Sequence, residues 1–142
     1  MMATYTYLNL DQWSDKIWKR ADDVIGNALG KVITRSQTPK AKGGRMPVLD
    51  GFLRKSLQSS LNGQGGLTGA ASHIAVTSAM KATDNAAFGW TMGYAMRQNY
   101  GFIGTDSAGR TYNQEGNHFL EYGTDQWQRY VNQQANRARG MA

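Results

Sequence analysis

A long run of apolar residues at steps of three and four constrains the fold of this 142-residue sequence more than any other feature. The run follows Asn9, a residue type that caps helices, and its spacing places one apolar stripe along a helix. Charged residues between Asp15 and Asp23 fall on the opposite face. We therefore predict a helix from about Asp11 to Thr34. Its stripe comprises Trp13, Ile17, Ala21, Val24, Ala28 and Val32, widened by Trp18, Ile25, Leu29 and Ile33.

Two tryptophans on this helix cannot face the same point. Five positions separate Trp13 from Trp18, which places them about 140° apart around the axis. We expect Trp13 to join the intramolecular core and Trp18 to lie near the edge of that core. The alternative places Trp18 in a contact between subunits, where tryptophan is enriched.

The stretch from Arg45 to Leu57 predicts a turn and then one turn of helix. Pro47 favours extended backbone at the residue before it, and Asp50-Gly51 is a dipeptide typical of turns. The following residues recur at helical spacing, so one side of this short helix is expected to land on the core. That side is formed by Phe52, Leu53, Ser56 and Leu57.

Residues 36–46 have no apolar periodicity and contain Lys40, Lys42 and Arg45. A structureless loop of this length inside a compact domain is uncommon, and it is usually functional or disordered. We predict that this segment is an extended, mobile basic arm.

The middle of the chain alternates apolar with small or polar residues, which is typical of strands. We expect strands at residues 73–78 and 86–94, joined as an antiparallel hairpin by a turn at 83–85. In the second of these strands, one face is formed by the small residues Ala87, Gly89 and Thr91, and we expect a helix to pack closely on that face. Before them, residues 58–69 predict a strand or helix end followed by an exposed glycine-rich turn.

The last third of the chain predicts helices around a polar segment. Residues 94–101 indicate a short helix that ends at a glycine, and residues 102–113 indicate a surface loop or hairpin. A second long helix follows, which Asn117 is expected to cap and Gly140 to stop.

Strands clustered between helices predict an α+β fold. We expect a long N-terminal helix, a small antiparallel β-sheet and a C-terminal helix packed on the sheet. The length fits one domain, residues 1–142, with an N-terminal tail at 1–10. The sheet should have an exposed edge, which would favour assembly with neighbouring copies.

The composition narrows the class of protein. Without cysteine there is neither a disulfide framework nor a thiolate metal site, and no apolar run approaches the ~18 residues of a membrane span. The start of the chain also lacks the pattern of a signal peptide, so we expect a soluble intracellular protein. The net charge of +6 is concentrated in residues 31–55, which hold seven basic residues and one acid. A flexible basic loop explains this better than a nucleic-acid site, because no aromatic residue is interleaved in the arm.

The sequence offers few residues in arrangements typical of catalytic sites. Ser56, His73 and Asp50 could form a hydrolase triad, but the Gly-x-Ser-x-Gly elbow is absent. The only other histidine, His118, lies near a predicted helix cap, and the acids are scattered, which disfavours a metal site. We expect a protein that is not an enzyme and that holds no cofactor or metal.

Three ordered blocks of the sequence carry a resemblance. They are Met46-Pro-Val-Leu-Asp-Gly-Phe-Leu-Arg-Lys-Ser-Leu57, Tyr94-Ala-Met-Arg-Gln-Asn-Tyr-Gly101 and Asn117-His-Phe-Leu120. In order and spacing they resemble the signature of a tailed-bacteriophage tail-component family, which includes head–tail connector, tail-completion and tail-terminator proteins. Asp50 stands where threonine is commoner in that family, and Asn99 where an acid is usual.

This resemblance implies a viral structural protein of the virion neck or tail, assembled in the host cytoplasm. Such a protein forms a homo-oligomeric ring, with six subunits the expectation, that completes or terminates the tail tube. Its partners would be other copies of itself, the tail tube protein and the head-closure or connector protein, with no membrane. Genomic DNA would pass through the lumen and contact the ring transiently and non-specifically.

Exposed aromatic and basic residues are the candidates for subunit or partner contacts. We expect the basic arm to reach neighbouring subunits and to become ordered on binding. The alternative function is that of a small basic DNA-binding protein that uses the cationic segment 31–55. The candidate interface residues are Trp18, Arg35, Lys40, Lys42, Arg45, Phe52, Arg54, Tyr100 and Phe102.

Overall fold

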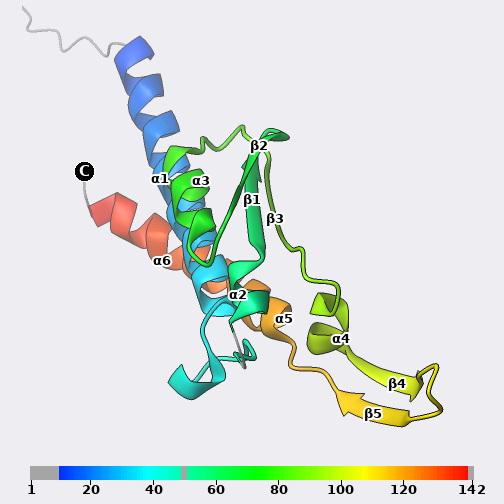
Figure 1. The fold of residues 1–142 in the computed structure, drawn as a ribbon. Helices are drawn as coiled ribbons and strands as arrows, with labels where there is room; N and C mark the ends of the chain where they lie inside the picture. The colour runs from blue at the N-terminus through cyan, green and yellow to red at the C-terminus, as the bar shows by residue number, and fades with distance from the viewer. Residues whose placement is uncertain (1–9, 49–50, 141–142) are drawn as a thin grey trace, which may run out of the picture.

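The computed structural model describes residues 10–48 and 51–140. The chain alternates helices with short strands, as Figure 1 shows. The elements are α1 (Leu10–Ser36), the 3-10 helix η1 (Lys40–Lys42), α2 (Phe52–Lys55), β1 (Leu57–Leu61), β2 (Gln64–Thr68), α3 (Ser72–Ala79), β3 (Ala86–Trp90), α4 (Ala95–Tyr100), β4 (Gly101–Thr105), β5 (Thr111–Glu115), α5 (Phe119–Thr124) and α6 (Trp127–Gly140).

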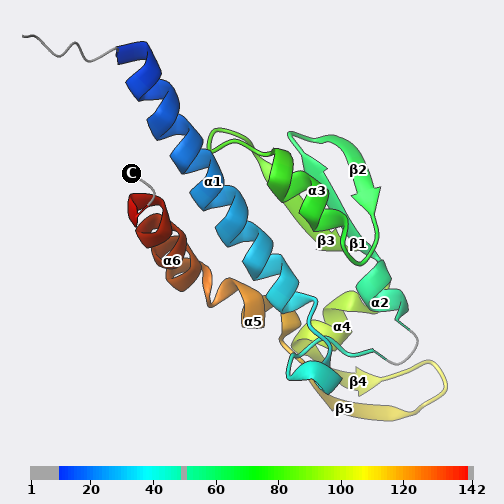
Figure 2. The same cartoon turned by 90° about the vertical axis from the view of Figure 1, so that its left-hand side faces the viewer.

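The long helix α1 is the element against which three other helices pack. α5 and α6 contact it on one side and α3 on another, and α3 also packs on β1 (Figure 2). One antiparallel sheet has the strand order β2-β1-β3, and β4 and β5 form a separate antiparallel hairpin at the far end of the molecule (Figure 1). The α+β class is confirmed. The C-terminal helix packs mainly along α1, and its Tyr130 reaches a core cluster that also holds residues of β1 and β3.

The prediction of a strand at residues 73–78 is wrong, because this segment is the helix α3. Its buried residues lie at helical spacing, namely His73, Val76, Thr77 and, just after the helix, Met80. Two glycines of α1 allow the close approach of α3. A Cβ at Gly26 would collide with the Thr77 carbonyl oxygen, and one at Gly30 would lie 3.2 Å from the Thr77 hydroxyl. The alternation of apolar and polar residues suggested a strand, but the same residues form the buried face of a helix that packs on α1.

The predicted hairpin of two central strands is also corrected. The strand at β3 exists but ends at Trp90, and its antiparallel partner is β1, with Leu57 opposite Trp90. The turn at residues 83–85 therefore joins a helix to a strand. Among the described residues, no helix packs closely on the small-residue face of β3: Ala87 is exposed, and a Cβ at Gly89 would meet none of their atoms within 4 Å. Residues 58–69 form most of the β1–β2 hairpin. Of the two predicted possibilities the strand is present, as β1, but β2 was not predicted and takes up part of the expected glycine-rich turn.

Residues 36–46 form a closed loop and not an extended arm. The Met46 amide donates to the Thr38 carbonyl at 3.1 Å, and the Lys40 amide donates back to the Met46 carbonyl at 3.1 Å. At Gly44 any side chain would collide with the backbone of Thr38. The Tyr122 hydroxyl donates to the Gly43 carbonyl at 3.1 Å and so fastens the loop to α5. Backbone hydrogen bonds, which leave no trace in apolar periodicity, shape this segment.

The short helix α2 follows Gly51 as predicted, but its inner face differs from the prediction. Leu53 and Leu57 are buried, and Ser56 is buried with its hydroxyl donating to the Leu53 carbonyl at 2.7 Å. Phe52, which was expected to face the core, is 55% exposed. Phe52 and Leu57 are five positions apart, which corresponds to about 140° around a helix, so they cannot share one face. The turn at Asp50 lies partly outside the described residues.

The C-terminal region contains two helices where one was predicted. The helix is interrupted between Thr124 and Trp127, so α5 and α6 run in different directions (Figure 1). The N-cap of α5 is His118, in the left-handed conformation. Asn117, the predicted cap, donates its side-chain amide to the Gln98 carbonyl at 2.9 Å and thus ties α5 to α4. The short helix α4, ended at Gly101, is confirmed, and the polar segment after it is the β4–β5 hairpin.

Candidate assembly surfaces and a cationic groove

The N-terminal turns of α1 extend beyond the other described helices and strands (Figures 1 and 2). Leu10, Trp13 and Ile17 share one helix face at steps of three and four, and they are 66%, 51% and 43% exposed. We call these three residues the helix-tip stripe. The expectation that Trp13 joins the core is wrong, because none of the described elements covers this part of α1. Trp18, the alternative interface residue, is exposed beside the stripe.

A second group of exposed apolar residues lies at the opposite end of the molecule. Met96 and Tyr100 are one helical turn apart on α4, and Tyr100 lines the same shallow hollow as Ile103 of β4. Their exposed fractions are 73%, 57% and 81%. We call Met96, Tyr100 and Ile103 the hairpin patch. Phe102, predicted as an interface residue, is half-buried and has the Arg97 guanidinium 4.2 Å from its ring centre.

One side chain orders the tip of the β4–β5 hairpin. The Asp106 carboxylate accepts hydrogen bonds from the Ala108 amide, from the amide and Nε of Arg110, and from the Tyr112 hydroxyl, at 2.8–3.0 Å. These bonds hold the pKa of Asp106 below its usual value, the Arg110 amide contributing most. The projecting hairpin is thus pre-organised by its own polar groups.

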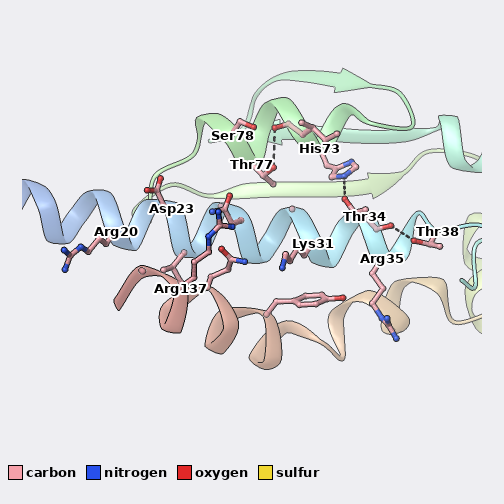
Figure 3. Close-up of a pocket in the computed structure, with 18 of the residues that line it drawn as sticks. Arg20, Asp23, Lys31, Thr34, Arg35, Thr38, His73, Thr77, Ser78 and Arg137 are labelled. Carbon is pink, nitrogen blue, oxygen red and sulfur yellow. Dashed lines mark hydrogen bonds between the residues drawn. The ribbon is translucent and has the colours of Figure 1, made fainter. Parts of the chain in front are cut away.

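A groove of about 1280 Å³ runs along α1 between α3 and α6 (Figure 3). Gly26, Asn27 and Gly30 lie along its base on α1. Apolar side chains occur along its length, with Ile74 on α3 and Ala138 on α6. The closed loop borders one end of the groove with Thr38, Lys42 and Gly43.

The groove is strongly cationic. Seven basic side chains line it against one carboxylate, that of Asp23, and none of the seven forms a salt bridge within the described part of the chain. They come from α1, the loop and α6. The seven are Lys16, Lys19, Arg20, Lys31, Arg35, Lys42 and Arg137.

Two of these cations lie over tyrosine rings. The Arg35 guanidinium is 3.7 Å from the Tyr122 ring centre, and its Nε donates to the Tyr122 carbonyl at 2.7 Å. Lys31 Nζ lies 5.7 Å from the Tyr130 ring centre. Arg35 is thus half-buried and positioned by α5, whereas Lys31 and Arg137 are exposed. Such cation–π contacts are worth about 0.5–2 kcal/mol.

His73 sits at the edge of the groove, almost entirely buried. Its Nε2 and the Thr34 hydroxyl are 2.9 Å apart, and its Nδ1 is buried without a hydrogen-bond partner among the described residues. Burial lowers the pKa of His73, and the charge of Arg54 lowers it further. The imidazole is therefore neutral at physiological pH.

Arg54, predicted as an interface residue, has an internal role. Its Nε donates to the Gln37 carbonyl at 2.9 Å, and the Gln37 side-chain amide donates to the carbonyls of Arg54 and Ala70 at 2.8 and 2.9 Å. The Gln37 side-chain oxygen accepts the Trp90 indole N–H at 2.9 Å. Gln37 therefore joins the end of α1 to α2, β3 and the segment before α3.

The predicted interface residues do not form one surface. Arg35 and Lys42 line the groove, Lys40 and Arg45 are exposed on the closed loop, and the remaining candidates are distributed over α1, α2 and the α4–β4 region. Sequence reasoning missed both apolar patches and four groove cations. Those missed are Leu10, Trp13, Ile17, Met96 and Ile103 for the patches and Lys16, Lys19, Arg20 and Arg137 for the groove.

The hydrolase triad considered from the sequence is not assembled among the described residues. The Ser56 hydroxyl donates to a backbone carbonyl, and His73 is bonded to Thr34. Asp50 lies outside the described residues. Within residues 10–48 and 51–140, no group of three His, Cys, Asp or Glu side chains could hold a metal ion.

None of the helices in the described ranges combines the length and the apolar character that crossing a bilayer requires. Comparison with models of protein families, with curated proteins and with solved structures gives no match for this chain.

Proposed function

We propose that this chain is a structural subunit of a tailed-phage neck or tail, without catalytic activity, that assembles with copies of itself into a ring. The ring, with six subunits the expectation, would complete or terminate the tail tube and join it to the head-side connector. The proposal rests on the resemblance of three sequence blocks and on how those blocks lie in the fold.

The single observation that carries the proposal is that all three blocks meet in one core cluster. Met46 and Leu53 come from the first block, and Phe119 from the third; all three are buried. Tyr94 and Ala95 of the second block pack against them. The three blocks, distant from one another in the chain, therefore pack on one another, which is the arrangement expected if together they form one structural unit.

Hydrogen bonds made by Asn99 also link the second block to the third. The Asn99 side-chain oxygen accepts the Leu120 amide at 3.0 Å, and the Asn99 amide group donates to Glu121 at 3.1 Å. The Asn99 carbonyl accepts the His118 amide at 2.9 Å. Asn99, which replaces the usual acid of the resembled family, therefore serves as the joint between the second and third blocks.

The distribution of exposed apolar residues supports assembly by head-to-tail contacts. The helix-tip stripe and the hairpin patch lie at opposite ends of the molecule, so one copy can place its patch on the stripe of the next (Figure 2). Contacts between two different surfaces generate rings when the rotation closes. Exposed apolar patches of this kind mark interaction sites on soluble proteins.

Mixing two charge variants tests the head-to-tail arrangement. We expect Trp13→Glu and Ile103→Glu each to remain monomeric in sedimentation experiments, because each removes one half of every contact. A mixture of the two should form a heterodimer, since one intact stripe then meets one intact patch. Asn136→Glu, an exposed site on α6, is the matched control and should assemble as the original chain does.

The outcome that contradicts the proposal is assembly of both glutamate variants without change. A mixture that remains monomeric while the unchanged chain assembles would reject this pair of surfaces.

DNA binding is the second candidate function, and the charge of the groove is the observation that favours it. The segment 31–55 does not act as one surface, because Arg54 is bonded to Gln37 and three other cations turn into the groove. A DNA-binding protein should have an affinity for duplex DNA that falls steeply as salt increases. A salt titration of a labelled duplex separates the two candidates, because a ring subunit should bind the duplex only weakly.

A further inference from the structure

We propose that the cationic groove between α3 and α6 is a docking site for an acidic amphipathic helix of a different protein. This inference depends on the groove alone and stands whether or not the chain forms a ring. Three properties of the groove point to this occupant: its charge, its apolar lining and the cations that already lie over its tyrosine rings.

The charge requires an acidic occupant. Seven cations against one carboxylate, with no salt bridge among the described residues, leave the electrostatic potential of the groove uncompensated. A second copy of the chain is poorly suited, because the whole chain carries a net charge of +6 and its acids are scattered. A partner with a locally acidic segment would neutralise these cations.

The apolar lining favours a peptide over a nucleic-acid backbone. Ile74 is 56% exposed on the α3 side, and Val24 and Ala138 contribute apolar surface from α1 and α6. A helix with one apolar stripe can cover these side chains while its acidic flanks reach the cations, which is the usual helix-in-groove mode of recognition. A phosphate backbone offers nothing to cover them.

The aromatic residues of the groove also favour a peptide over a nucleic acid. Single-stranded nucleic acids bind by stacking bases on aromatic rings. The two tyrosine rings of the groove, Tyr122 and Tyr130, already have Arg35 and Lys31 over them.

The test uses the full chain and a fluorescent synthetic peptide of Leu, Ala and Glu. The peptide has about 18 residues, leucines at i, i+3, i+4 and i+7 spacing, and a net charge of about −6. We expect binding by fluorescence anisotropy, and a peptide of the same composition in scrambled order should bind at least about tenfold more weakly, because it has no apolar stripe.

Charge reversal locates the binding. The double variant K31E/R137E should lose at least about tenfold in affinity for the peptide, because it replaces two of the seven groove cations by acids, one on α1 and one on α6. The matched control K55E/K81E reverses two exposed lysines away from the groove and should lose less than about twofold. Circular dichroism of each variant checks that the fold is retained.

Several results would overturn the proposal. These are an absence of peptide binding, equal binding of the scrambled peptide, or equal losses in the two double variants. The groove would be assigned to nucleic acid if a single-stranded oligonucleotide of equal charge bound more tightly than the peptide and K31E/R137E abolished that binding. Self-association that is lost in the same variant would assign it to a second copy.

Discussion

Replacing Phe119 by alanine tests whether the three sequence blocks form one energetic unit. Phe119 is 1% exposed, and its ring meets the Trp90 ring edge-on, with the centres 4.9 Å apart and an interplanar angle of 77°. A buried Phe→Ala change costs about 3–5 kcal/mol through lost transfer energy and the cavity left behind. The edge-to-face contact provides about 0.5–1.5 kcal/mol of such a loss.

Phe52→Ala is the matched control, because it deletes the same atoms at a side chain that is 55% exposed. Full burial of a phenylalanine is worth roughly 1.5–3 kcal/mol, so the control should cost about 1 kcal/mol. Urea denaturation followed by circular dichroism measures both changes in the free energy of unfolding. Phe119→Leu, expected to cost less than about 1.5 kcal/mol, provides a value should the alanine variant not fold.

Equal losses for Phe119→Ala and Phe52→Ala would refute the reasoning. They would mean that the packing of the third block on the first contributes no more than an exposed ring does, and the common core of the three blocks would lose its energetic basis.

Three further predictions concern single residues. Gly123→Ala should destabilise the fold by about 1–3 kcal/mol in urea, because its Cβ would collide with the last turns of α1, whereas Gly140→Ala, with nothing within 4 Å, should not. Gln37→Ala should cost about 2–4 kcal/mol in the same assay, because it leaves the Trp90 indole N–H and buried carbonyls unpaired. The pKa of His73 is lowered by burial first and by a nearby guanidinium second, so the unfolded chain takes up this proton at a higher pH than the folded chain. The stability should therefore fall as the pH drops below about 6.5, and His73→Gln should remove that part of the dependence; an unchanged slope would contradict it.

The sequence correctly predicted helices that have a long apolar pattern or a recognisable residue at their end. α1 was found within two residues at each end, because its apolar stripe continues over many turns. α4 was found through its terminal glycine. The strand prediction at α3 failed because alternation and helical spacing overlap in eight residues, and only the contact with α1 decides between them.

The surfaces could not be predicted, because a helix stripe looks the same in sequence whether its partner is the same chain or another. Trp13 and Ile17 continue the stripe of Val24 and Ala28 without a break, yet Trp13 and Ile17 are exposed whereas Ala28 is buried. The groove is less predictable still. Its cations include Lys16 and Arg137, which are far apart in the sequence and lie along one groove only because α6 folds back along α1.

Negative-stain imaging of the purified full chain tests the central claim most directly, namely that this protein is a building block whose two ends join copies head to tail. The account predicts closed rings of uniform diameter, and it predicts that these rings are absent from images of Trp13→Glu and Ile103→Glu. Single small particles from the unchanged chain, at concentrations where sedimentation also detects only monomer, would contradict it.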